Sequence, residues 1–248
     1  MKLIVYRNER EASAATAEEL ASAIVRHPAM VLGLPTGRTP LPLYARLAEL
    51  REQRHFDASR VTTFNLDEFW RLPASHPGSY RAYMERHVFS RLAIAAGQVG
   101  FLDGMAPDAE TECLQYERAI RAAGGLDVLI LGIGTNGHIG FNEPGASLRA
   151  RTHLAALKPQ TRRANAVFFE GDASKVPGQA LCMGMGTILG ARRIILMAFG
   201  RGKSKAIQGM VQGPVTTRLP ASFLQLHADV DVVLDEGAAE RLAASQAG

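Results

Sequence analysis

Residues 132–145 combine a histidine, a carboxylate and an amide in one glycine-rich stretch, GIGTNGHIGFNEPG. His138 and Glu143 lie five positions apart, and Asn136 stands two positions before the histidine. An imidazole titrates near neutral pH, so a histidine beside a carboxylate is suited to proton transfer. A histidine by itself is more often structural, but this one lies among glycines with Asn and Glu nearby. We interpret the stretch as an active-site loop.

The same stretch matches the pattern G-x-G-x-x-G at residues 132–137, which raises a dinucleotide-binding alternative. That motif opens a helix and is followed by an acidic residue about 20 positions later. Here a proline and a glycine follow at 144–145, and no Asp or Glu lies between Glu143 and Glu170. The dinucleotide interpretation therefore fits poorly.

Adjacent acids follow a second apolar run, in the sequence FNLDEFW at residues 64–70. Asp67 and Glu68 in that position are often a solvated helix cap, and this interpretation stays open. At the carboxyl end of a buried strand, however, burial would raise the pKa of Asp67 and make it a base.

A third loop, GLPTGRTP at residues 33–40, has residues that suit an anion. Thr36, Gly37 and Thr39 provide backbone N–H groups at the start of a predicted helix. Arg38 adds a guanidinium fork that matches phosphate. A tight strand-to-helix turn with an exposed arginine is an equal alternative.

A fourth loop, GRGKSK at residues 200–205, resembles the end of a phosphate-binding P-loop. The first glycine of that motif would fall at Met197, so the full motif is absent. What remains is Lys203 at the amino end of a predicted helix, where an amine favours a phosphate monoester. An exposed basic turn is again an equal alternative.

The elements that must position these loops can be predicted from the apolar pattern. Apolar runs predict strands at 3–6, 30–34, 61–64, 128–131, 194–199 and 230–234. Helical spacing and start signals predict helices at 12–26, 40–51, 77–92 and 108–123. Strands alternating with helices indicate an α/β fold, a Rossmann-like, doubly wound, mainly parallel sheet flanked by helices. The four loops would then lie over the carboxyl ends of the strands, where such sheets bind ligands.

Composition limits the class of protein. The 248 residues show no linker, so we expect a single domain over residues 1–248. The net charge of +4 comes from scattered Lys and Arg without interleaved aromatics, which argues against a nucleic-acid partner. No apolar run approaches the roughly 20 residues that span a bilayer, so no membrane association is expected. Only Cys113 and Cys182 are present, which favours reduced thiols, no metal site and a cytoplasmic protein.

Together the loops resemble the glucosamine-6-phosphate deaminase family, also called glucosamine-6-phosphate isomerase. The resemblance runs almost from end to end and rests on LGLPTGRTP, FNLDEF, HPGSY, GIGTNGHIGFNEPG, ARTH at 150–153, GKSKA and LQLH near Leu224. The GHIGFNEP block is highly specific. The related 6-phosphogluconolactonases share the fold but continue differently after Gly-His.

The resemblance implies conversion of D-glucosamine 6-phosphate and water to D-fructose 6-phosphate and ammonia, in amino-sugar catabolism and without a cofactor. It gives Asp67 the role of the base that moves a proton from C2 to C1. His138 would open the sugar ring, with Asn136 and Glu143 orienting its imidazole. Residues Thr36, Gly37, Arg38, Thr39 and Lys203 would bind the phosphate.

The chain departs from the family at three points. Asn136 stands where many members have Asp, so a relay of three acids is not expected. Arg38 replaces the second glycine of the first loop, and Val167 stands where many members have a phosphate-binding arginine. Our hypothesis is that Arg38 supplies the guanidinium lost at Val167. The alternative is weaker phosphate binding or another sugar.

Other features of the family bear on regulation and on competing functions. Ala146, His153 and Ala155 stand at positions that are basic in allosteric members, so activation by N-acetylglucosamine 6-phosphate is not expected. A galactosamine 6-phosphate isomerase, a lactonase and a non-catalytic sugar-phosphate sensor are the alternatives. A homo-oligomer stays open.

Overall fold

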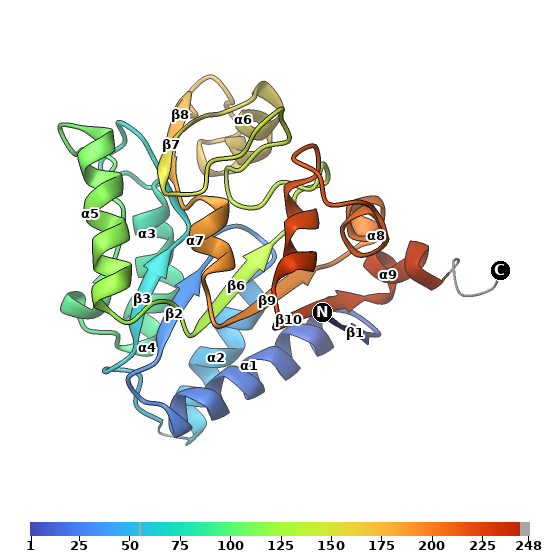
Figure 1. Cartoon of the computed structure of the whole chain (residues 1–248). Coiled ribbons are helices and arrows are strands. Elements are labelled where there is room, and N and C mark those ends of the chain that lie inside the picture. The colour runs from blue at the N-terminus through green and yellow to red at the C-terminus, as the bar shows by residue number, and fades with distance from the viewer. Residues whose placement is uncertain (55, 244–248) are drawn as a thin grey trace.

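The computed structural model describes residues 1–54 and 56–243, and its larger sheet is parallel throughout. Within these residues the sheet has seven strands in the order β1-β10-β9-β6-β2-β3-β5 (Figure 1). The strands are Lys2–Tyr6 (β1), Val31–Leu34 (β2), Thr62–Asn65 (β3), Val99–Gly100 (β5), Val128–Gly132 (β6), Arg193–Ala198 (β9) and Val230–Asp235 (β10). The predicted strands are confirmed, each within one residue at either end. The two-residue strand β5 is too short to give a periodic signal and was not predicted.

Helices connect these strands. The longer ones are Glu9–Arg26 (α1), Leu41–Arg54 (α2), Ala109–Ala122 (α5), Ser204–Gln212 (α8) and Glu236–Ala243 (α9). The shorter ones are Tyr80–Met84 (α3), Ser90–Leu92 (α4), Pro159–Asn165 (α6) and Met185–Leu189 (α7). A π-helical turn, Glu85–Phe89 (η1), joins α3 to α4, and 3₁₀ turns lie at Ala96–Gln98 (η2), Ala166–Phe168 (η3), Arg201–Lys203 (η4) and Pro220–Leu226 (η5).

The predicted helices are confirmed, and their starts follow from capping. Helix α1 begins three residues before the prediction because the Asn8 side chain accepts a hydrogen bond from the Glu11 N–H at 2.9 Å. Helix α5 begins after Asp108, whose carboxylate accepts from the Thr111 N–H at 2.8 Å. The helix expected to end at residue 92 does so, although its middle turn is the π-helix.

The sheet is buried on both faces, which explains the continuous apolar runs of its strands. In β6, Leu129 and Leu131 pack with residues of α5, α7, α8 and α9, whereas Val128 and Ile130 pack with α1, α2 and α3. Figure 1 shows α1 and α2 on one side of the sheet and α5 and α7 on the other. The doubly wound α/β prediction is thus confirmed.

A second sheet, not predicted from the sequence, stands beyond the carboxyl ends of the first. Asp67–Phe69 (β4) pairs antiparallel with Gln179–Cys182 (β8), which pairs antiparallel with His153–Ala156 (β7). Its core holds Phe69, Tyr80 and Phe141. Figure 1 shows β7, β8 and α6 together at the end toward which the arrows of β3 and β6 point. The interpretation of residues 67–68 as a solvated helix cap is therefore wrong, because they form a buried strand.

The chain reverses its direction across the larger sheet between β2 and β6. From β2 it proceeds through β3 to the edge strand β5, and from β6 it proceeds through β9 and β10 the other way. Loops diverge at such a point and leave a crevice over the carboxyl ends. The four predicted loops follow β2, β3, β6 and β9, which are neighbours in the sheet. No helix in the described part of the chain is long and apolar enough to cross a membrane.

Candidate active site

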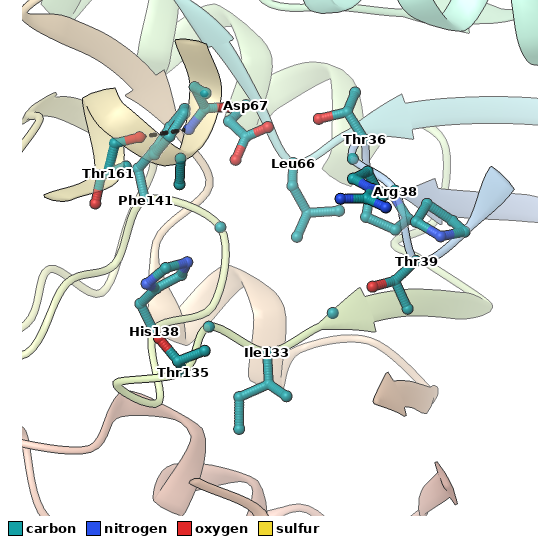
Figure 2. A pocket seen from close by; sticks show the side chains of 18 of the residues that line it. Thr36, Arg38, Thr39, Leu66, Asp67, Ile133, Thr135, His138, Phe141 and Thr161 are labelled. Carbon is teal, nitrogen blue, oxygen red and sulfur yellow. Dashed lines mark hydrogen bonds between the residues drawn. The ribbon is translucent and has the colours of Figure 1, made fainter. Parts of the chain in front are cut away.

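A cavity of about 290 Å³ lies where these four loops meet. Eight of the nine residues predicted for the site line it: Thr36, Gly37, Arg38, Thr39, Asp67, Asn136, His138 and Lys203. The ninth, Glu143, lies behind the lining and reaches the cavity through Asn136. In Figure 2, Asp67 and His138 border the cavity opposite Arg38 and Thr39.

Asp67 is a buried carboxyl group to which the described residues donate no hydrogen bond. The residue is 5% exposed, and among the described residues its carboxyl group makes no hydrogen bond to a protein group. Burial, and secondarily the charge of Glu68, raises its pKa from 3.8 to about 8. The surrounding groups cannot offset this: Cys182 faces it across β4 and β8, and two buried tyrosines, Tyr80 and Tyr116, lie nearby. An unsatisfied, poorly ionised carboxylate at a cavity wall is the arrangement expected of a general base.

The next residue, Glu68, is buried for a structural reason. Its carboxylate accepts hydrogen bonds from the N–H groups of Phe69 at 2.8 Å, Tyr80 at 3.0 Å and Arg81 at 2.8 Å. Tyr80 and Arg81 begin α3, so Glu68 caps that helix from a distant strand. Burial still raises its pKa to about 7, and the three N–H donors oppose that rise. Glu68 thereby fixes α3, and with it Tyr80, against β4.

His138 belongs to a chain of hydrogen bonds, called the His138 relay below, that fixes its tautomer. Its Nδ1 lies 2.7 Å from Asn136 Oδ1, and Asn136 Nδ2 donates to Glu143 Oε2 at 3.0 Å. Because the Glu143 carboxylate accepts, the amide turns its oxygen to the imidazole, so Nδ1 carries the proton. The other ring nitrogen, Nε2, keeps its lone pair. Burial lowers the pKa of His138, against the opposing charge of Glu143, which favours this neutral form.

Two glycines allow the close packing around His138. A Cβ at Gly134 would lie 2.2 Å from His138 Cε1, so only glycine fits beneath the ring. Gly140 has φ +54°, and a Cβ there would lie 3.2 Å from Asp67 Oδ2 and 3.3 Å from Cys182 Sγ. The loop therefore passes tightly between the imidazole and the carboxylate.

The relay continues to a residue that sequence reasoning missed. Thr161 of α6 donates its hydroxyl hydrogen to Glu143 Oε1, and its backbone carbonyl accepts from Asn165 Nδ2 at 2.9 Å. Both residues line the cavity, and Figure 2 shows Thr161 on the same side as His138. Nothing in the local pattern TRRAN marked these residues, because their partners lie far away in the sequence. A third such residue, Tyr80, lay in the HPGSY stretch quoted for the resemblance.

The loop after β2 is held with its carbonyl groups turned away from the cavity. The buried Tyr44 donates its hydroxyl to Pro35 O at 2.6 Å, and Tyr83 donates to Gly37 O at 2.6 Å. Gly37 has φ +105°, which L side chains rarely adopt. The pinned carbonyls leave the N–H groups of the loop free for an anion. Arg38 is exposed at the cavity edge.

Lys203 lines the same cavity, in η4 immediately before α8. Its Nζ donates to Ile133 O at 2.6 Å, and burial lowers its pKa. It therefore stands at the cavity as predicted, one residue before the helix proper. Val167, by contrast, is 62% exposed and absent from the cavity lining.

The family described as glucosamine-6-phosphate isomerases/6-phosphogluconolactonase matches residues 8–233. A glucosamine-6-phosphate deaminase from Halothermothrix orenii is 47% identical over 242 residues, 98% of this chain and 100% of that protein. One from Clostridium perfringens is 43% identical over the same shares. A solved structure of a monomeric glucosamine-6-phosphate deaminase matches with a TM-score of 0.93 at 40% identity, covering 97% of this chain and 99% of that one. A 6-phosphogluconolactonase from Trypanosoma cruzi, at 21% identity with a TM-score of 0.75, covers 97% of this chain and 96% of its own and shares the fold.

Proposed function

The chain belongs to the family of glucosamine-6-phosphate isomerases and 6-phosphogluconolactonases, and we propose that it converts D-glucosamine 6-phosphate and water to D-fructose 6-phosphate and ammonia. The observation that carries this proposal is the pair of groups at the cavity. Within residues 1–54 and 56–243, Asp67 is a buried carboxylate without a hydrogen bond, and His138 is held as a neutral imidazole whose Nε2 has no hydrogen-bond partner. An aldose-to-ketose conversion needs both groups, a base for carbon and a separate proton carrier for oxygen.

Ring opening is the step assigned to His138. The free Nε2 takes the proton of the C1 hydroxyl and returns it to the ring oxygen, so the ring C–O bond breaks and the open-chain aldehyde forms. Asn136 keeps Nδ1 protonated meanwhile, which prevents the ring from presenting the wrong nitrogen. Glu143 stabilises the charge that develops on the imidazole during transfer.

Isomerisation is the step assigned to Asp67. Its carboxylate removes the C2 proton to give an enolamine and returns that proton at C1, which yields the imine of fructose 6-phosphate. Water then adds to the imine and ammonia leaves. Asp67 must be ionised to begin, and the ammonium group of the substrate at C2 favours that form by its opposite charge.

Phosphate binding is assigned to the loop at 33–40 and to Lys203 of the same cavity. The N–H groups of Thr36, Gly37 and Thr39, the Arg38 guanidinium and the Lys203 ammonium would together bind the anion, and their common place in the cavity lining supports this assignment. Holding the phosphate there places C1 and C2 between Asp67 and His138 by binding energy remote from the reacting atoms.

Ammonia release from D-glucosamine 6-phosphate tests the proposed function directly. The wild-type protein should release ammonia and form fructose 6-phosphate, and Asp67→Asn should reduce the rate by about a thousandfold or more. Galactosamine 6-phosphate and 6-phosphogluconolactone serve as comparison substrates. Turnover of only one of these would refute the proposal, and binding without any turnover would indicate a sensor.

Arg38 gives a second, narrower test, since it replaces a glycine of many relatives while Val167, which is too short to reach a phosphate, stands where many of them have an arginine. If its guanidinium contacts the phosphate, Arg38→Ala raises KM about tenfold or more and changes kcat little. Val167→Arg in the same background is the matched variant, because it restores a guanidinium at the position where relatives carry it. An unchanged KM in Arg38→Ala would exclude the compensation.

The place of action that fits this substrate is the cytoplasm, because a phosphate ester is too highly charged to cross a bilayer unaided. A monomer fits the solved relative that is described as monomeric. Size-exclusion chromatography with light scattering distinguishes that state from a homo-oligomer.

A further inference from the structure

Helix α6 is hydrogen-bonded to Tyr80 of α3 and to the His138 relay, and we propose that Thr161 in this helix is a positioning residue that couples the phosphate loop to that relay. The inference rests on the proposed function only in placing the substrate phosphate at residues 33–40. Thr161 is 5% exposed and takes part in two hydrogen bonds. Its backbone carbonyl accepts from Asn165, and its hydroxyl donates to Glu143.

The path begins at the phosphate loop. Tyr83 of α3 donates its hydroxyl to Gly37 O at 2.6 Å, and Tyr80 of the same helix donates its hydroxyl to Asn165 Oδ1 at 2.8 Å. Asn165 Nδ2 in turn donates to the Thr161 carbonyl at 2.9 Å. A bound anion at residues 33–40 would therefore be felt at α6 through α3 and Asn165.

The path ends at the imidazole. The Thr161 hydroxyl donates to Glu143 Oε1, while Asn136 donates to Glu143 Oε2 and accepts from His138. Asn136 Oδ1 also accepts from the His138 backbone N–H at 3.2 Å, which helps to hold the amide in this orientation. The orientation of His138 is thus tied to a hydroxyl on another helix.

A phosphate can change this path through α3, because Tyr83 of that helix holds the Gly37 carbonyl of the loop. An anion bound by the N–H groups of the loop shifts Gly37 and with it α3, so the bond from Tyr80 to Asn165 readjusts.

Removal of the Thr161 hydroxyl should release Glu143. Its side chain is 8% exposed, so an oxygen deprived of its donor finds little water. Glu143 Oε2 already lies 3.9 Å from His138 Nδ1, and a released carboxylate can take the imidazole directly in place of the Asn136 amide. The imidazole would then lose its fixed position relative to the substrate.

The fold offers a matched control for this hydrogen bond. Thr187 in α7 donates its hydroxyl to Glu117 Oε1 at 2.5 Å, which is the same pair of residue types in a partly buried place. Neither Thr187 nor Glu117 lines the cavity. Thr187→Val therefore removes a bond between the same residue types that has only a structural role, and Glu117 Oε1 then keeps two donors from Thr152.

Steady-state kinetics of three variants separate positioning from folding. Thr161→Val should lower kcat about ten- to a hundredfold with KM within about threefold of the wild type, as expected for a charge-assisted bond. Thr161→Ser, which keeps the hydroxyl, should recover kcat to within about threefold, and Thr187→Val should lower thermal stability without lowering kcat. A wild-type kcat in Thr161→Val, or equal losses in the Ser and Val variants, would overturn the proposal.

The second measurement needs no turnover, so it stands even if the proposed function fails. The imidazole ¹⁵N resonances of His138, identified by their loss in His138→Gln, report which ring nitrogen carries the proton. We expect a single Nδ1–H tautomer whose shifts change when inorganic phosphate is added. In Thr161→Val the Nδ1–H tautomer should persist, but its ¹⁵N shifts should move to those of an imidazole bonded to a carboxylate, and the phosphate response should weaken. An identical response in both proteins would show that phosphate acts on His138 through space alone, against the proposal.

Discussion

Asp67 and Glu68 are consecutive acids on one short strand, equally buried, yet their surroundings are opposite. Because side chains alternate along a strand, the two carboxylates point to opposite sides of β4. Glu68 meets three backbone N–H donors on its side, whereas Asp67 meets a cavity, a thiol and tyrosine rings on the other. Burial by itself therefore does not mark a functional acid. What distinguishes a candidate catalytic acid is burial at a cavity wall without a hydrogen-bond donor.

The two acids should also differ in how their ionisation makes the free energy of unfolding depend on pH. The pKa of Asp67 is raised from 3.8 to about 8, so between these values the unfolded chain has released a proton that the folded protein keeps. Stability therefore falls as pH rises through that window and is constant above it. Ionisation of Glu68 also lowers stability as pH rises, but over a narrower pH range, because its N–H donors offset part of the burial cost and its pKa is raised only from 4.5 to about 7.

The largest expected effect is at Asp67. Asp67→Asn removes the base and also the cost of burying its charge, so the variant should be inactive and more stable than the wild type. The gain in unfolding free energy should grow between pH 4 and pH 8 and reach about 2–4 kcal/mol above it. Chemical denaturation across this pH range measures it. A variant that is less stable than the wild type at pH 8 would show that Asp67, like Glu68, has a structural partner.

Glu68 should give the reverse result. Glu68→Gln places an amide NH₂ against one of three backbone N–H donors, most directly that of Arg81. We expect a loss of about 1–3 kcal/mol of unfolding free energy. The folded fraction should keep kcat within about tenfold of the wild type, measured below the transition temperature. Loss of kcat as large as in Asp67→Asn would place Glu68 in the chemistry and remove the contrast.

The sequence was sufficient to predict the parts of the site that depend on local order. Apolar runs located the strands, and their carboxyl ends located the four loops that meet at the cavity. Glycine-rich composition and residue type then selected His138, Asn136 and Lys203. Residue type and position indicated Asp67 as a base and Glu143 as the partner of His138, the family resemblance gave them their particular steps, and these roles remain predictions.

What the sequence could not provide depends on contacts between distant segments. Strand β4 has three residues, which are too few to show a periodic pattern. Its partner strand β8 lies more than 100 positions later in the chain. The contrast between Asp67 and Glu68 is likewise set by Cys182 on one side and by α3 on the other. Thr161 reaches Glu143 only after β7 and α6 fold back over the sheet. Such partners require the three-dimensional arrangement.

The smallest expected effect concerns the thiol beside Asp67. Cys182 is the cross-strand partner of Asp67, and its Sγ accepts from the Phe141 N–H at 3.2 Å and donates to Met183 O at 3.3 Å. Sulfur is a weak hydrogen-bonding group, so it leaves the carboxylate unsupported. The titratable groups that act electrostatically with Asp67 are Glu68, which points to the other side of the same strand, Tyr80 of α3, Tyr116 of α5 and Cys182 of β8.

Of these neighbours, Cys182 can be made a stronger donor with the least change in volume. Since the base works only when ionised, kcat/KM should rise with pH along a limb near 8. In Cys182→Ser a hydroxyl dipole stabilises the carboxylate, and the limb should move to lower pH by about half a unit to one unit. Cys182→Ala supplies no donor, so its limb should stay in place while stability falls by about 1 kcal/mol through the unpaired Phe141 N–H. Equal shifts of the pH limb in both variants would mean that packing, rather than the missing donor, raises the pKa of Asp67. The two acids would then differ only in that Asp67 lies at a cavity.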